Sequence, residues 1–179
     1  MGVGMAAALF VAILAGLALS SLALGTSPAL AQASATLGAD RAQLAACLRD
    51  NRSATPSCIG AIAVGCLGSA GTDRRAAEVG CARREETVWR ERLTQALQVS
   101  GRTLDAGQRS RLAALHLSWE GFIAQKCAFY GSIQREGWQL GRQAGCELRE
   151  VALRALELER AAPSQTPTRR PQSPPQIFR

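Results

Sequence analysis

Six cysteines behind an apolar N-terminal segment are the feature that most constrains this chain of 179 residues. Residues 1–31 are typical of an export signal, because Met5–Leu24 is almost wholly apolar and Ala29-Leu30-Ala31 has the A-x-A form of a cleavage site. Export leads to an oxidising periplasmic or extracellular compartment, where an even number of cysteines predicts disulfide bonds. The apolar run is also long enough to span a membrane, so an uncleaved N-terminal anchor is the alternative.

Two long antiparallel helices are predicted for the middle of the chain. Between residues 72 and 98 there is no proline, and one helical face repeats every three or four positions: Ala77, Cys81, Glu85, Trp89, Leu93 and Ala96–Leu97. Asp105 and Gln108 resemble a capping box that starts the second helix, which continues through Trp119 to Cys127. A turn near residues 101–103 places Cys81 and Cys127 at similar distances along the two arms. We therefore predict a Cys81–Cys127 disulfide across the open end of this hairpin.

Shorter helices are predicted on both sides of the hairpin. Residues 40–50 and 57–67 form a small helical hairpin around a turn at residues 51–56, and residues 32–38 are a leader of small residues. Cys47 and Cys58 flank the turn almost symmetrically, so we predict that they pair. Residues 146–160 form the last helix. By elimination Cys66 pairs with Cys146, which would tie the last helix to the front of the domain.

The stretch between residues 128 and 145 is rich in glycine and allows two interpretations. Gly137, Gly141 and Gly145 recur at four-residue spacing, which suits either a closely packed helix face or a loop with an irregular turn. Trp138 lies among them. It is a candidate binding anchor if it is exposed, or a lid over the hairpin core if it is buried.

The sequence contains no pattern typical of catalysis or metal binding. His116 is the only histidine and no C-x2-C spacing occurs, so neither a zinc site nor a cysteine–histidine nucleophile is predicted. Glu85 lies on the apolar face of its helix, where a carboxylate must find a partner or shift its pKa. One interpretation makes Glu85 a general acid, but the spacing places no second carboxylate beside it, so we favour a structural ion pair or cap. Our hypothesis is that Arg154 of the last helix is its partner in an ion pair. The chain is thus expected to be no enzyme and to need no cofactor.

The net charge of +7 comes almost entirely from arginine. Part of it lies in residues 161–179, which hold five prolines with Ser, Thr and Gln and are predicted to be a disordered basic tail. Such a protein is expected either to carry a solvated basic surface or to contact an anionic envelope surface or an acidic partner. Nucleic-acid binding has little support, because the aromatic residues are not interleaved with arginine.

A set of spaced residues resembles the LprI-like family of lysozyme-inhibitor domains. The resemblance rests on Cys81-x3-Glu85-x3-Trp89-x3-Leu93, Trp119-x2-Phe122-x4-Cys127, Gly131-Ser132, and Cys146 followed after eight residues by Arg154. It covers residues 66–160. Members are small exported bacterial helical domains, most of them without an established function. The resemblance implies a protein-binding role, with a lysozyme or related muramidase as the partner.

These observations predict one all-α domain over residues 39–160. It would consist of a disulfide-stapled antiparallel hairpin, a C-terminal helix and a short N-terminal helical hairpin. The leading function is that of an exported, non-enzymatic protein-binding domain that inhibits a lysozyme. The alternative is a structural or envelope-associated periplasmic protein without inhibitory activity.

Overall fold

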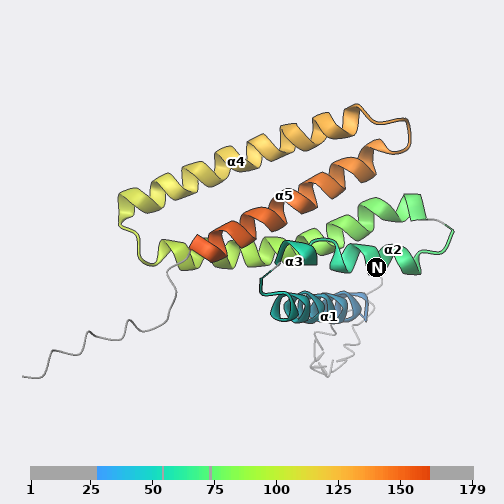
Figure 1. The fold of residues 1–179 in the computed structure, drawn as a ribbon, viewed down its shortest axis with the longest axis horizontal. Coiled ribbons are helices and arrows are strands. Elements are labelled where there is room, and N and C mark those ends of the chain that lie inside the picture. Colours follow the sequence, from blue (N-terminus) through green and yellow to red (C-terminus); the bar gives the residue numbers. More distant parts are fainter. Residues whose placement is uncertain (1–27, 54, 73, 162–179) are drawn as a thin grey trace, which may run out of the picture.

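The computed structural model describes residues 28–53, 55–72 and 74–161, and in this part of the chain helices joined by short turns are the only regular elements, with no strand. The elements are α1 (Pro28–Asp50), the 3-10 helix η1 (Thr55–Cys58), α2 (Ala61–Ser69), α3 (Arg74–Gly101), α4 (Ala106–Ser132) and α5 (Gln139–Ala161) (Figure 1). The predicted all-α class is confirmed. The predicted capping box is also present, since the Asp105 side chain accepts from the Gln108 amide while the Gln108 side chain accepts from the Asp105 amide.

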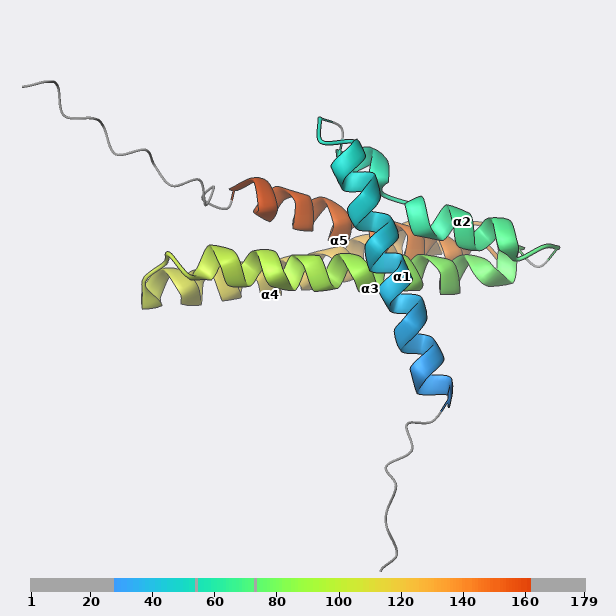
Figure 2. The same cartoon turned by 90° about the horizontal axis from the view of Figure 1, so that it is seen from below.

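Helix α5 lies between α3 and α4, so these three helices form one layer (Figure 1). Helices α1 and α2 pack on α3, and α1 crosses it steeply (Figure 2). We expected the two arms of the central hairpin to pack directly against each other along their length. Instead α5 occupies that space, because it presents an apolar face wide enough to pack on both neighbours, buried at Leu148, Val151, Ala152, Ala155, Leu156 and Leu158.

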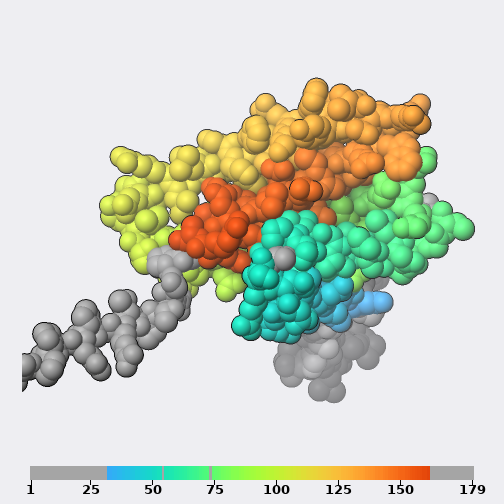
Figure 3. Space-filling model, viewed as in Figure 1, coloured from blue at the N-terminus to red at the C-terminus, as the bar shows by residue number. Residues whose placement is uncertain are grey.

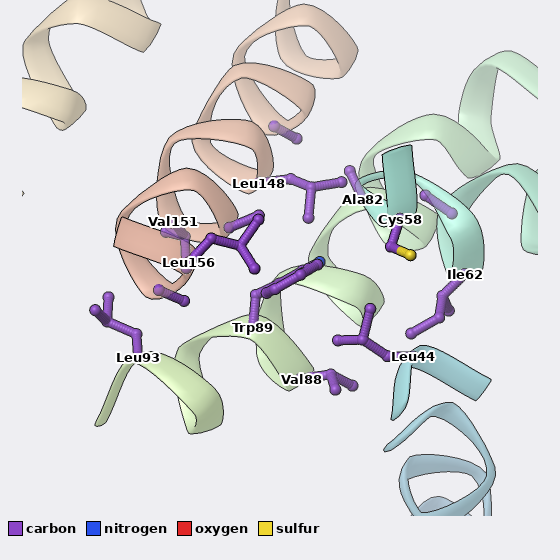
Figure 4. Packing of buried hydrophobic residues seen from close by; sticks show 14 of the residues in the cluster. Leu44, Cys58, Ile62, Ala82, Val88, Trp89, Leu93, Leu148, Val151 and Leu156 are labelled. Carbon is purple, nitrogen blue, oxygen red and sulfur yellow. The ribbon is translucent and has the colours of Figure 1, made fainter. Parts of the chain in front are cut away.

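The core is centred on Trp89 of α3, which is fully buried. Figure 4 shows its indole between Leu148, Val151 and Leu156 of α5 on one side and residues of α1, η1 and α2 on the other. Four elements therefore meet at one aromatic side chain. This region also holds the fully buried Leu44 and Ile62.

Three disulfides join the six cysteines, and two of the three predicted pairings are wrong. Cys47 pairs with Cys58 as predicted, with Cα atoms 5.8 Å apart. Cys66, however, pairs with Cys81 (5.6 Å), and Cys127 pairs with Cys146 (5.4 Å). The predicted Cys81–Cys127 and Cys66–Cys146 bonds do not form, because α5 separates the two arms that the first would have joined. Each cysteine instead bonds to the next one along the chain.

Two segments without a definite helix prediction from the sequence are largely helical. Helix α1 begins at Pro28, so it includes the leader at residues 32–38, and α4 and α5 leave only residues 133–138 between them. Gly131 and Gly141 allow the close packing that we considered for the glycine-rich stretch. A Cβ atom at Gly131 would lie 3.0 Å from the carbonyl oxygen of Gln139, and one at Gly141 would collide with the Glu78 side chain.

The predicted export signal at residues 1–31 and the predicted tail at residues 161–179 lie almost wholly outside the described residues. The apolar run at residues 5–24, the alternative membrane anchor, lies among the residues that are not described, and the cleavage motif Ala29–Ala31 lies in the first turn of α1. Among the helices that are described, none combines the length and apolarity needed to cross a bilayer. The three disulfides are typical of an oxidising extracellular or periplasmic compartment.

Candidate functional site

Glu85 is fully buried and acts as the N-terminal cap of α2. One carboxylate oxygen accepts from the Gly60 amide (2.7 Å) and from the Trp89 indole nitrogen (2.9 Å). The other accepts from the amides of Ile62 (2.9 Å) and Ala63 (2.8 Å). These donors include the first free N–H groups of α2, where the helix dipole also favours a negative charge. The Glu85 carboxylate thus has four donors around it and a structural role.

The predicted ion pair between Glu85 and Arg154 is wrong. Arg154 lies on the side of α5 that faces α4, where its guanidinium is 5.9 Å from the centre of the Trp119 ring and donates to Glu157 at 2.9 Å. Glu85 lies on the side of α3 that faces α2. The prediction failed because it paired charges by residue type, whereas the actual partners of Glu85 are backbone groups.

A second buried carboxylate went unnoticed in the sequence. Asp40 of α1 is almost fully buried, and Arg84 of α3 donates to both of its oxygens at 2.6 Å. These hydrogen bonds raise the pKa of Arg84 above its ordinary value. The two residues are 44 positions apart in the chain, so no local sequence pattern predicts that they pair. It anchors α1 to α3 beside the Glu85 cap.

Trp138 is half-buried at the start of α5, which places it between the two interpretations of the sequence. It follows Gly137, whose φ of 80° lies in the left-handed region that favours glycine. The guanidinium of Arg75 stacks on the ring, 4.4 Å from its centre. One face of the indole therefore contacts the N-terminal end of α3, and its position beside α3 is favoured by this cation–π contact.

Trp138 stands at one end of a groove that we call the Trp138 groove. It lies between α2 and α5, which both pack on α3 without packing extensively on each other. It encloses about 460 Å³ and is lined by Ala63, Leu67, Glu78, Ala82, Trp138, Gly141, Arg142, Gly145, Cys146, Leu148 and Arg149. A further hollow of about 300 Å³ beside η1 shares Gly145, Leu148 and Arg149 with this groove, so the groove continues along α5.

The wall of the Trp138 groove combines apolar surface with positive charge. Arg142 and Arg149 line it from α5, and within the described residues neither has a carboxylate partner. Glu78 is the only acid among the lining residues. Gly145 leaves open space at the groove, since a Cβ atom there would contact nothing within 4 Å. This combination suits an acidic group carried on an apolar or extended partner.

A separate hollow, distinct from the Trp138 groove and its continuation, lies where α3 turns into α4. It encloses about 600 Å³ and is lined by Leu97, Gln98, Gly101, Arg102, Arg109, Leu112, Ala113 and His116. His116 stacks on Trp119 with ring centres 5.5 Å apart, and its Nε2 lies 3.7 Å from Glu120. The walls are mainly apolar, and the hollow lacks the placed aromatic anchor of the Trp138 groove.

No protein-family model, curated protein or solved structure matches this chain. No group of three or more potential metal ligands occurs within the part of the chain that the structure describes. The case for a function therefore rests on the residues and surfaces described above.

Proposed function

We propose that this protein is an exported, non-enzymatic protein-binding domain of the LprI-like type that inhibits a lysozyme or related muramidase. The observation that carries the proposal is the Trp138 groove, where a half-buried tryptophan that contacts Arg75 stands beside Arg142 and Arg149, which have no carboxylate partner among the described residues. Tryptophan and arginine are the residues that most often dominate protein interfaces. The LprI-like part of the proposal rests on the resemblance in the sequence.

The chemistry of a muramidase cleft suits this groove. Glycosidases of this kind hold two carboxyl groups on either side of the bond that they cleave. An arginine offers five donors in a planar fork that matches a carboxylate. Arg142 and Arg149 lie on the same face of α5, seven residues apart, and we propose that they contact the acidic cleft while Trp138 packs on its apolar rim.

Calorimetry with a panel of lysozymes, with residual muramidase activity read in parallel, tests this proposal. The oxidised protein is expected to bind one member saturably at one to one and to reduce its activity. Trp138→Ala and Arg142→Ala should each weaken binding at least about tenfold, as expected for residues at the centre of an interface. Arg49→Ala, at the exposed end of α1, is the matched control and should bind normally.

Two outcomes contradict the proposal. The first is the absence of binding across the panel with all disulfides intact. The second is binding that the groove variants leave unchanged.

The alternative is an envelope-associated protein without inhibitory activity. It predicts non-saturating adsorption to envelope material, and this adsorption falls as the salt concentration rises. The salt dependence of the association rate reveals the sign of the partner's charge. Added salt lowers the association rate with an oppositely charged partner and raises it with a partner of like charge.

A further inference from the structure

The outer face of α4 carries large apolar side chains that no other described element covers. Leu115, Phe122 and Phe129 are 62%, 60% and 60% exposed. They are spaced by seven residues, so they share one face of the helix, which we call the α4 stripe. At 1.5 Å per residue the stripe is about 21 Å long.

The α4 stripe faces away from the rest of the molecule. Helix α4 packs on α5 through Ile123 and Cys127, which lie on a different side of the helix from Phe122. In Figure 1, α4 is the outermost helix of the three-helix layer. Figure 3 shows it along the upper edge in yellow and orange. A row of large apolar side chains that stay exposed on one helix face is a candidate interaction site.

The charges on α4 indicate what this face contacts. Its only acid, Glu120, is directed inward and accepts from Arg90 of α3 at 2.9 Å. Arg111 lies one turn before Leu115 on the same face, and Lys126 lies 5.8 Å from the centre of the Phe122 ring while also pairing with Glu150. The stripe thus combines leucine and phenylalanine with cations and has no acid of its own.

We propose that the α4 stripe binds the surface of an anionic lipid membrane. A helix that lies in a membrane interface has this arrangement: apolar side chains enter the acyl boundary and flanking cations contact the headgroups. A second copy of the stripe fits less well, because symmetric pairing brings Arg111 and Lys126 of both chains to one seam without any acid. This proposal is independent of the proposed inhibition, since the stripe and the Trp138 groove lie on different helices.

Flotation with lipid vesicles tests the proposal. The protein, exported to the periplasm of a bacterial host and recovered with its disulfides formed, is mixed with vesicles of phosphatidylcholine alone or with phosphatidylglycerol added. We expect binding to the anionic vesicles, weaker binding at high salt, and at least a fivefold loss in the variant Phe122→Ser/Phe129→Ser. Because both side chains are mostly exposed, this variant should fold normally.

Leu117→Ser is the matched control. Leu117 is on the same helix and is 72% exposed, but it lies on the opposite side from Leu115, so its loss should leave vesicle binding unchanged. Equal binding by the stripe variant and the wild type would overturn the proposal, and so would an absence of binding to anionic vesicles.

Sedimentation of the protein alone provides a separate test. A dimer that dissociates in the stripe variant would show that a second copy covers this face.

Discussion

The two arms of the α3–α4 hairpin differ sharply in how tightly the rest of the molecule packs on them. The N-terminal half of α3 is enclosed by α1, η1, α2 and α5, two of the three disulfides lie there, and the Glu85 carboxylate is fully satisfied. Helix α4, in contrast, buries only Ile123, Cys127 and Gly131 and packs mainly on α5. Stability is thus concentrated where these elements meet, which we call the enclosed end of α3. Of the two surfaces proposed for binding, the α4 stripe lies on the sparsely packed arm, whereas the Trp138 groove borders the enclosed end, between α2 and α5.

The two tryptophans give the sharpest test of this difference. Trp89→Ala removes the side chain at which four elements meet, and we expect it to lower the free energy of unfolding by about 4 kcal/mol. Trp119→Ala, on α4, removes a half-buried side chain and should cost about 1–2 kcal/mol. Urea denaturation of both variants measures the two values. Equal losses would show that α4 is as tightly integrated as α3.

Glu85→Ala tests whether the capped carboxylate stabilises the enclosed end. The change leaves three backbone amides and the Trp89 indole without their acceptor, so we expect a loss of about 3 kcal/mol. Glu157→Ala is the control, because it removes the exposed partner of Arg154 and should change stability by less than about 0.5 kcal/mol. A double-mutant cycle of Glu85 and Arg154 should show no coupling between them.

One disulfide joins α2 to the enclosed end of α3, and another joins α4 to α5. Removing Cys66–Cys81 or Cys127–Cys146 opens loops of 15 and 19 residues and should each cost about 2–3 kcal/mol. In Cys81→Ser the new free thiol should be that of Cys66, identified by alkylation and peptide mass spectrometry. A free thiol at Cys127 would instead support the hairpin clasp that the sequence suggested.

The smallest effect is expected at the exposed contact between α1 and α3. Arg41 donates to both oxygens of Glu91, at 2.7 and 2.6 Å, and these hydrogen bonds lower the pKa of Glu91 from its ordinary value of 4.5. Because the pKa is lowered in the folded state, the contribution is present above pH 4.5 and is lost as the pH falls below it. The stability difference between wild type and Glu91→Gln should therefore shrink in acid, as measured by urea midpoints from neutral to low pH. A difference that grows in acid would contradict this sign.

Local patterns in the sequence determined the helical class, the long α3 and α4, the capping box at Asp105 and the Cys47–Cys58 bond. Each of these depends on residues close together in the chain, where periodicity and spacing report the geometry directly. The glycine-rich stretch was ambiguous, because the cost of glycine in a helix is repaid only by packing that a local pattern does not show.

Only the tertiary structure decided which helices meet. Helix α5 lies between α3 and α4. This single placement explains why two disulfides and the partner of Arg154 differ from those that we predicted. An apolar stripe shows that a face will be buried but does not specify against what, because hydrophobic attraction has no direction. The partners of a buried polar group are equally hard to predict from the sequence, as Glu85 shows. Its donors are mostly backbone amides of α2, and every residue except proline carries such an amide, so no residue pattern reveals them.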